Sequence, residues 1–301
     1  MSGERAMSAR PTLGERMPRA GRITIEPMTN SRPIRIGVQV APQHATFETI
    51  RDTAVQLEEL GVDIIFNWDH FYPLSGERDG LHFESWTMLA ALAELTTRVE
   101  LGALVNCNSY RNPSLQADMA RTIDHISAKG GTGRFVFGTG AGWFQRDYDE
   151  YGYDFGTPGS RLAALAHDLP IIRDRWTKLN PAPTRDIPIL IGGGGEKKTL
   201  RIVAEHADIW HSFSDAPTLE RKLGILAKHG EDVGRDTSVI EISTEVGRRP
   251  VGTTGGATGP DSADELVALG ATLFTVGLSG PHYDLERVRD WLSWRDGHNG
   301  A

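Results

Sequence analysis

The stretch "DIPILIGGGGEKKTLRIVAEHADIWHSF", residues 186–213, holds one strand–helix–strand unit. Its first apolar run, "IPILI", leads into four consecutive glycines, helical spacing follows from near Glu196, and a second apolar run, "DIWHSF", completes the unit. Continuous apolar runs are typical of strands that are buried on both faces of a parallel sheet. The unit therefore predicts an α/β protein in which helices join parallel strands.

The same alternation extends in both directions from this unit. Helical patterns separate most of the apolar runs, and a longer, aromatic-rich interval follows Trp143. Eight strand–helix units in roughly 260 residues match the count and size of a (β/α)8 TIM barrel, here with an insertion between its fourth and fifth strands. A doubly wound parallel sheet is the alternative. The eight runs span residues 34–40, 62–68, 99–105, 134–140, 187–193, 208–213, 240–246 and 271–278.

Start and stop signals place several of the helices. Gly61 is expected to end the first helix, and Ser85 is expected to cap the N-terminus of the second. Pro170 should kink or split the helix in which it lies, because it lacks a backbone N–H. Pro217 is expected at the first position of the helix after the sixth strand.

Composition limits the kinds of partner. The chain has 301 residues, a net charge of −8 and one cysteine, Cys107. The negative charge gives no support to a nucleic-acid partner, no apolar run approaches a membrane span, and a single cysteine fits a reducing, cytoplasmic setting. The first residues are rich in Arg, Gly and Pro and lack apolar periodicity. We expect residues 1–32 to be a disordered extension and residues 33–301 to form one barrel domain.

Glycines gather where two of the predicted strands end. The run Gly192–Gly195 precedes a helix whose first turn holds Lys198 and Thr199, so backbone N–H groups and the helix dipole converge on an anion site. The run is not a P-loop, because no Gly-Lys-Ser/Thr follows it. The glycines of "FGTGAGW", residues 137–143, leave room for a flat ligand above the barrel. For the run Gly192–Gly195 the alternative is a flexible turn that binds no ligand. For the glycines of residues 137–143 the alternative is tight packing at a barrel corner.

Asp69 and His70 follow the second predicted strand, in "NWDHF". The strand ends form the active-site face of a TIM barrel, so we expect this pair on the rim of the site. A histidine there can donate, accept or shuttle a proton near neutral pH. A purely structural role is the alternative. We expect no metal site, because the sequence contains no Cys/His cluster.

Several segments, taken in order, resemble one family. Their order and spacing resemble the luciferase-like monooxygenase superfamily, and specifically its branch of oxidoreductases that depend on the deazaflavin coenzyme F420. The resemblance covers about residues 34–280. It implies a TIM-like barrel with the flavin-type ring at the C-terminal mouth. The matching segments are "DHF" (69–71), "LGALVNCNSYRNP" (101–113), "DHIS" (124–127), "GTGAGWF" (138–144), "YGYDF" (151–155) and "IPILIGGGGEKKTL" (187–200).

The resemblance also implies which residues bind the cofactor. Asp69 matches a residue beside the ring, and residues 105–107 match a bulge behind the ring that often holds a cis non-proline peptide. Gly192–Gly195 match the segment that holds the cofactor phosphate. The implied cofactor-binding residues are Asp69, Val105, Asn106, Cys107, Gly140, Ala141, Gly142, Trp143, Gly192, Gly193, Gly194, Gly195, Lys198 and Thr199.

The catalytic residues that we expect are His70 and Glu150. His70 matches a residue beside the ring, and we expect it to move a proton. Trp143 stands where the sugar-phosphate dehydrogenases of the family carry a glutamate, so a sugar-phosphate substrate is not expected. Asp147, Asp149 or Glu150 could replace that glutamate as the proton donor, and we select Glu150.

The resemblance implies an oxidoreductase that moves a hydride between coenzyme F420 and a small organic substrate. One alternative is a monooxygenase of the luciferase-like type that uses reduced FMN and oxygen. Another is a non-catalytic flavin-binding subunit, since the superfamily contains such proteins. A homodimer is left open. Fold alone does not decide among these functions.

Overall fold

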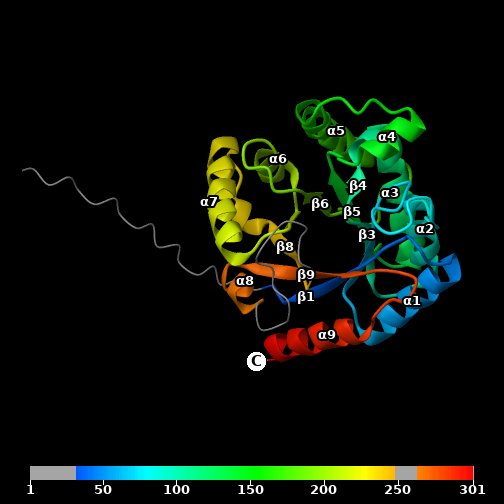
Figure 1. Cartoon of the computed structure of the whole chain (residues 1–301). Coiled ribbons are helices and arrows are strands. Elements are labelled where there is room, and N and C mark those ends of the chain that lie inside the picture. The colour runs from blue at the N-terminus through cyan, green and yellow to red at the C-terminus, as the bar shows by residue number, and fades with distance from the viewer. Residues whose placement is uncertain (1–31, 248–262, 301) are drawn as a thin grey trace, which may run out of the picture.

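The computed structural model describes residues 32–247 and 263–300. Parallel strands form a closed barrel with helices around the outside (Figure 1). Neighbouring strands follow the order β3-β2-β1-β9-β8-β7-β6-β5, and pairing of β3 with β5 closes the ring. The two-residue β4 continues β3 after a bulge, so nine strands make an eight-stranded barrel. The strands are β1 (Arg35–Val40), β2 (Ile64–Asn67), β3 (Glu100–Ala103), β4 (Asn106–Cys107), β5 (Phe135–Gly140), β6 (Ile189–Gly192), β7 (Ile209–Ser212), β8 (Glu241–Val246) and β9 (Ala271–Leu278).

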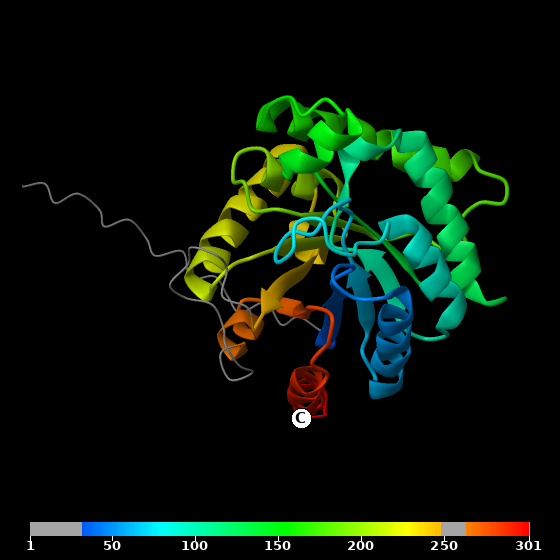
Figure 2. The same ribbon diagram turned by 45° about the vertical axis from the view of Figure 1, so that its right-hand side comes forward.

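The predicted (β/α)8 barrel is therefore confirmed, and the doubly wound sheet is excluded. Helices lie all round the strands (Figure 2). The insertion carries α4, between β5 and α5. The expected disordered extension lies outside the described residues, except for residue 32. The helices are α1 (Phe47–Leu60), α2 (Ser85–Leu95), α3 (Pro113–Ala128), α4 (Gln145–Tyr151), α5 (Pro158–Lys178), α6 (Thr199–His206), α7 (Ala216–Val233), α8 (Asp264–Ala268) and α9 (Glu286–Asn299).

Helix ends follow the sequence signals only in part. Gly61 ends α1 in the left-handed region at φ 95°, as predicted. Ser85 is not the N-cap of α2; the carboxylate of Glu84 accepts hydrogen bonds from the N–H groups of Trp86 and Thr87 instead. Pro170 does not split α5, which runs unbroken across it because buried apolar side chains on both sides hold the helix on the barrel. Pro217 is the second residue of α7, not the first.

The barrel interior is filled in layers. At the N-terminal end, Arg35 donates to Glu100 and Glu241, with both ion pairs at 2.6 Å. Above this ionic layer lies an apolar layer, and the half-buried Leu104 and Val105 pack on it. Because side chains fill the lower barrel, a ligand can enter only at the C-terminal mouth. The apolar layer consists of Ile64, Phe66, Val136, Leu190, Ile209 and Leu273.

A larger apolar core fills the space between the strands and the helices. Trp86, Trp210 and Trp291 are among its largest fully buried side chains. Burial at roughly 25 cal/mol per Å² of apolar surface makes this core the main source of stability. Among the described residues, no helix is long and apolar enough to cross a bilayer.

Candidate active site

A bulge between β3 and β4 forms the floor of the mouth. Its Leu104–Val105 peptide bond is cis, as the resemblance implied. A Cβ atom at Gly140 or at Gly192 would lie 2.8 Å from a methyl carbon of Val105. Real Cβ atoms do not approach other heavy atoms this closely, so both positions need glycine for Val105 to lie across the ends of β5 and β6. The bulge and two of the predicted glycines therefore form one apolar surface.

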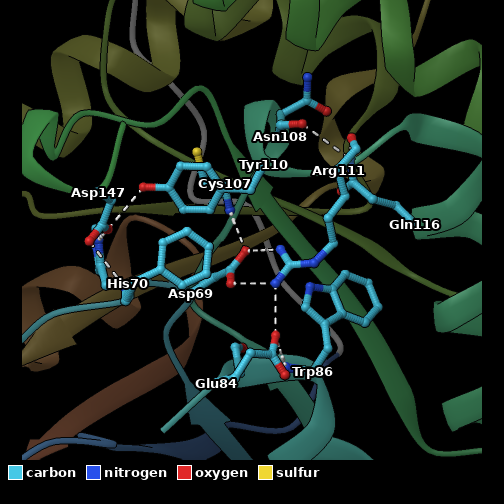
Figure 3. Close-up of polar contacts among 12 residues, drawn as sticks. Asp69, His70, Glu84, Trp86, Cys107, Asn108, Tyr110, Arg111, Gln116 and Asp147 are labelled. Atoms are coloured by element: carbon cyan, nitrogen blue, oxygen red, sulfur yellow. Dashed lines mark hydrogen bonds and ion pairs between the residues drawn. The ribbon is translucent and has the colours of Figure 1, made fainter. Parts of the chain in front are cut away.

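Asp69 and Arg111 hold this bulge in place (Figure 3). The Asp69 carboxylate accepts two hydrogen bonds from the Arg111 guanidinium, at 2.6 and 3.0 Å, and one from the backbone N–H of Cys107 at 3.2 Å. Arg111 also donates to Glu84 at 2.7 Å. Burial raises the pKa of Asp69, and the Arg111 charge opposes this rise. We predicted that Asp69 contacts the cofactor. In the structure its carboxylate instead binds Arg111 and the backbone of the bulge.

His70 is held by a buried carboxylate that comes from the insertion. Its Nδ1 lies 2.7 Å from Oδ2 of Asp147, whose side chain is fully buried. The Tyr110 hydroxyl donates to the same oxygen at 2.9 Å, and the Phe71 N–H donates to Oδ1 at 3.2 Å (Figure 3). An ionised carboxylate only accepts hydrogen bonds, so Nδ1 of His70 carries the proton. This leaves Nε2 as the ring atom that can exchange a proton with a ligand.

Aromatic side chains surround the His70 ring at the mouth. Trp143 and Phe144 lie edge-to-face with it, with ring centroids 5.7 and 5.4 Å away. Trp143 is 63% exposed, so a large apolar surface beside His70 faces solvent. Trp210, by contrast, is fully buried between barrel and helices. Trp143 and Phe144 can therefore contact a substrate, and Trp210 cannot.

Glu150 does not reach His70. It lies at the exposed end of α4, where its carboxylate pairs with Arg146 at 3.6 Å. Asp147, three residues earlier on the same helix, faces inward instead. Asp149 is exposed like Glu150. The carboxylate that binds His70 is therefore Asp147, one of the three candidates from the sequence. Glu150, which we selected, forms an ion pair at the surface instead.

The remaining predicted residues of the mouth are mostly structural. Cys107 Sγ lies 3.1 Å from the Tyr148 hydroxyl, and burial raises the pKa of the thiol to about 11, so it stays protonated at neutral pH. Gly142 has φ 82° and leaves no space for a Cβ beside Cys107 and Tyr148. Asn106 is fully buried, and within residues 32–247 and 263–300 neither polar atom of its side chain has a hydrogen-bond partner. Ala141, next to Gly142, is half-buried and packs on the outer core.

The run Gly192–Gly195 leaves β6 and turns outward from the mouth. Gly193 has φ 131°; its N–H donates to the carbonyl of His211 at 3.0 Å, and its carbonyl accepts from Trp210 Nε1 at 2.8 Å. These bonds fix the start of the loop, and Trp210 supports it from outside. The helix after the loop, α6, begins at Thr199 and not near Glu196. Six residues, 193–198, therefore separate β6 from this helix.

One lysine amine reaches this loop, and a second lies by the start of α5. A Cβ at Gly194 would collide with Nζ of Lys222, which reaches it from α7. A Cβ at Gly159 would lie 3.6 Å from Nζ of Lys198, so that amine lies by the start of α5. Neither lysine forms an ion pair with any carboxylate in residues 32–247 or 263–300. Burial lowers the pKa of Lys222.

The sequence did not single out Lys222. It lies 28 positions after Gly194 in an ordinary helical pattern, and no local motif marks it. Only the packing of α7 against α6 brings its amine to the glycines. The candidate site thus joins an apolar floor, a histidine with a free ring nitrogen, and a glycine loop with the Lys222 amine beside it. Within the described residues, no group of three or more His, Cys, Asp or Glu side chains could hold a metal ion.

Known proteins share parts of this architecture. The chain is 28% identical to pyrimidine monooxygenase RutA of Methylorubrum populi over 234 residues, covering 68% of this chain and 61% of that protein. It is 26% identical over 193 residues to F420-dependent glucose-6-phosphate dehydrogenase of Amycolatopsis mediterranei, covering 58% and 54%. A solved F420-dependent secondary alcohol dehydrogenase, in complex with an F420-acetone adduct, matches with a TM-score of 0.75 at 14% identity, over 88% of this chain and 99% of that one.

These matches differ in what they establish. The chain spans about three-fifths of the length of the curated relatives that it matches first. The likeness to the solved structure, at 14% identity, shows the fold. A family match covers residues 31–247, which include the bulge, the His70–Asp147 pair and the glycine loop. On this match over more than half of its length, the chain belongs to the luciferase-like monooxygenase family.

Proposed function

We propose that this chain is an oxidoreductase that binds coenzyme F420 and transfers a hydride between it and a small organic substrate. Its family contains oxidoreductases and monooxygenases, among them the F420-dependent and pyrimidine-oxidising relatives described above. The observation that carries the proposal is the His70–Asp147 pair at 2.7 Å, with Trp143 and Phe144 against the His70 ring. Hydride transfer at a carbon that bears oxygen requires a proton to move as well, and this pair can move one.

The residues at the mouth fit a cofactor with a planar ring and a phosphate. Val105 offers an apolar surface where Gly140 and Gly192 carry no side chain, and a flat ring packs well on such a surface. Gly193–Gly195 provide backbone N–H groups next to the Lys222 amine, which suits an anionic group. The same two features serve F420 and FMN alike, so they identify a class of cofactor.

The protein's part in the reaction is to position groups and to hold a proton. When bound, the deazaflavin supplies two-electron hydride chemistry. His70 accepts or donates a proton at Nε2 as a substrate hydroxyl becomes a carbonyl, or the reverse. Asp147 keeps the ring oriented through Nδ1–H and stabilises the imidazolium that forms. The exposed Trp143 and the adjacent Phe144 hold the apolar part of the substrate next to His70.

A specific observation favours a second function. The highest identity reported above, 28%, is to a pyrimidine monooxygenase. A monooxygenase that uses reduced FMN would use the same floor and phosphate loop. By contrast, a non-catalytic binding subunit would not need a fully buried carboxylate that accepts hydrogen bonds from His70 and Tyr110. We therefore retain the FMN monooxygenase as the rival and set the binding subunit aside.

Fluorescence titration of the purified protein with F420 and with FMN tests the proposal. We expect F420 to bind more tightly. Tighter binding of FMN by tenfold, a difference of about 1.4 kcal/mol, would favour the monooxygenase instead. Reduced F420 is then offered a panel of ketones, and oxidised F420 the matching secondary alcohols, with loss or gain of its visible absorbance as the readout. A protein that binds F420 and turns over neither panel would contradict this substrate class.

His70→Asn tests the role of the histidine. The variant keeps a side chain of similar size that can form hydrogen bonds, but it cannot titrate. Turnover should fall by roughly 10²- to 10⁴-fold, the range for a lost general acid–base, while the dissociation constant of the cofactor changes little. Turnover within a few-fold of the wild type, together with a large loss of cofactor affinity, would show that His70 only binds.

A further inference from the structure

His211 lies inside the barrel at the level of the floor. Side chains alternate along β7: Ile209 belongs to the apolar layer of the interior, and Trp210 belongs to the outer core. His211, two residues after Ile209, therefore points inward. It pairs in register with Gly192 on β6 and with Ser243 on β8. Since Gly192 is one of the glycines on which Val105 rests, the imidazole lies beside the floor.

One nitrogen of this imidazole has a partner and the other has none. Nδ1 lies 2.9 Å from the Ser243 hydroxyl. Nε2 is buried and has no hydrogen-bond partner among the described residues. Burial lowers the pKa of His211 to about 3, so the ring is neutral at working pH. A buried polar group without a partner is destabilising and calls for an explanation, such as a ligand that completes it.

An exposed ring lies against His211. Phe213, which follows β7, is 63% exposed and lies edge-to-face with His211 at 5.4 Å. An exposed side chain changes rotamer readily, so a ligand can displace this ring and reach Nε2. At this level Val105 fills the space that side chains at Gly140 and Gly192 would take, so a flat group here would lie on Val105 beside His211.

We infer that His211 binds the redox ring of the cofactor, with Nε2 hydrogen-bonded to the polar edge that carries carbonyl and N–H groups. The inference rests on the proposed function, since it needs a flavin or deazaflavin at the mouth. His211 lies level with the Val105 floor, whereas Lys222 lies outward, at Gly194. The two residues therefore contact different parts of the ligand: His211 the ring, Lys222 the phosphate. A neutral imidazole can donate or accept, so it can pair with either group on the ring edge.

Ligands of increasing length separate these contacts. We would titrate the wild type and two variants with lumiflavin, riboflavin and FMN, which add first the hydroxylated chain and then the phosphate to one ring. If the protein accepts only deazaflavins, 5-deazalumiflavin and the ring-plus-chain precursor of F420 replace them, with F420 as the third ligand. His211→Leu should weaken all three ligands by a similar factor, roughly 2- to 12-fold for one lost hydrogen bond. Lys222→Met should weaken only the phosphorylated ligand.

The results that overturn the inference are distinct. Unchanged lumiflavin affinity in His211→Leu refutes a contact with the ring, whether or not FMN binding falls. If the leucine variant does not fold, His211→Gln and His211→Asn test the contact in its place. Glutamine places its amide near the position of Nε2, and asparagine places its amide near the position of Nδ1. Glutamine should keep lumiflavin binding better than asparagine, and equal losses would refute the role of Nε2. A wild type that binds no flavin and no deazaflavin refutes the proposed function itself, before any variant is made.

Discussion

Asp147→Asn tests whether the buried carboxylate controls His70. The wild-type carboxylate accepts from His70 Nδ1–H, from the Tyr110 hydroxyl and from the Phe71 N–H. The asparagine side chain has nearly the same shape but carries no charge and presents an N–H₂ group in place of one acceptor oxygen. His70 then loses the acceptor for Nδ1–H, so we expect the neutral ring to adopt the tautomer with its proton on Nε2.

The structure sets the size of the effect. A hydrogen bond to a charged group contributes about 1.5–3 kcal/mol, and each 1.36 kcal/mol is tenfold in rate. If this energy stabilises the imidazolium of His70 during the reaction, turnover falls by roughly 10- to 150-fold. The dissociation constant of the cofactor should stay within about twofold, because Asp147 is fully buried and does not line the mouth.

Two measurements are needed for this variant. Turnover of F420 with the ketone and alcohol panels gives the rate, and nitrogen-15 NMR of labelled histidines gives the tautomer of His70. Asp149→Asn, on the same helix with an exposed side chain, is the matched control for the lost charge and should behave like the wild type. Wild-type turnover in Asp147→Asn, with the proton still on Nδ1, would refute the reasoning.

Other substitutions test the support of the site. Gly194→Val should displace the Lys222 amine and weaken FMN or F420 by about tenfold without affecting their dephosphorylated analogues in fluorescence titration; equal losses would place the phosphate elsewhere. Arg111→Met should lower the free energy of unfolding by about 3–5 kcal/mol in urea, because it leaves Asp69 buried without its partner; a loss below 1 kcal/mol would contradict this. The pKa of His211 is about 3 in the folded protein and 6.5 in the unfolded chain. As the pH falls below 6.5, only the unfolded chain binds a proton at this residue, so the free energy of unfolding falls. The wild type should therefore lose about 2 kcal/mol more stability than His211→Leu between pH 7 and pH 5 in urea denaturation, and equal losses would refute the shift.

The barrel could be predicted from the sequence because its strands are local patterns. Each strand is a short apolar run followed by a helical pattern, and eight such units are typical of one fold. Local signals failed where tertiary contacts outweighed them. Pro170 lies within an unbroken helix because buried neighbours hold both halves on the barrel. Glu84 replaces Ser85 as the cap because the Ser85 hydroxyl donates to Asn67 instead.

The site was predictable where it lies next to a strand end. His70 and Gly192–Gly195 follow strands directly, so their place at the mouth follows from the fold. The expectation that Asp69 contacts the cofactor and that Glu150 donates a proton depended on where side chains point. Asp69 turns to Arg111, 42 positions away, and Glu150 turns to solvent. No pattern within either segment shows these directions.

The sequence by itself determined the fold, the face that carries the site, the family and the glycine loop, because each depends on residues that are neighbours along the chain. The tertiary structure decided which side chains meet: Asp147 with His70, 77 positions apart, Lys222 with Gly194, and His211 with the edge of the Val105 floor. Side-chain contacts of this kind depend on how helices and loops pack across the barrel. That packing minimises the free energy of the whole chain, and no short segment contains it.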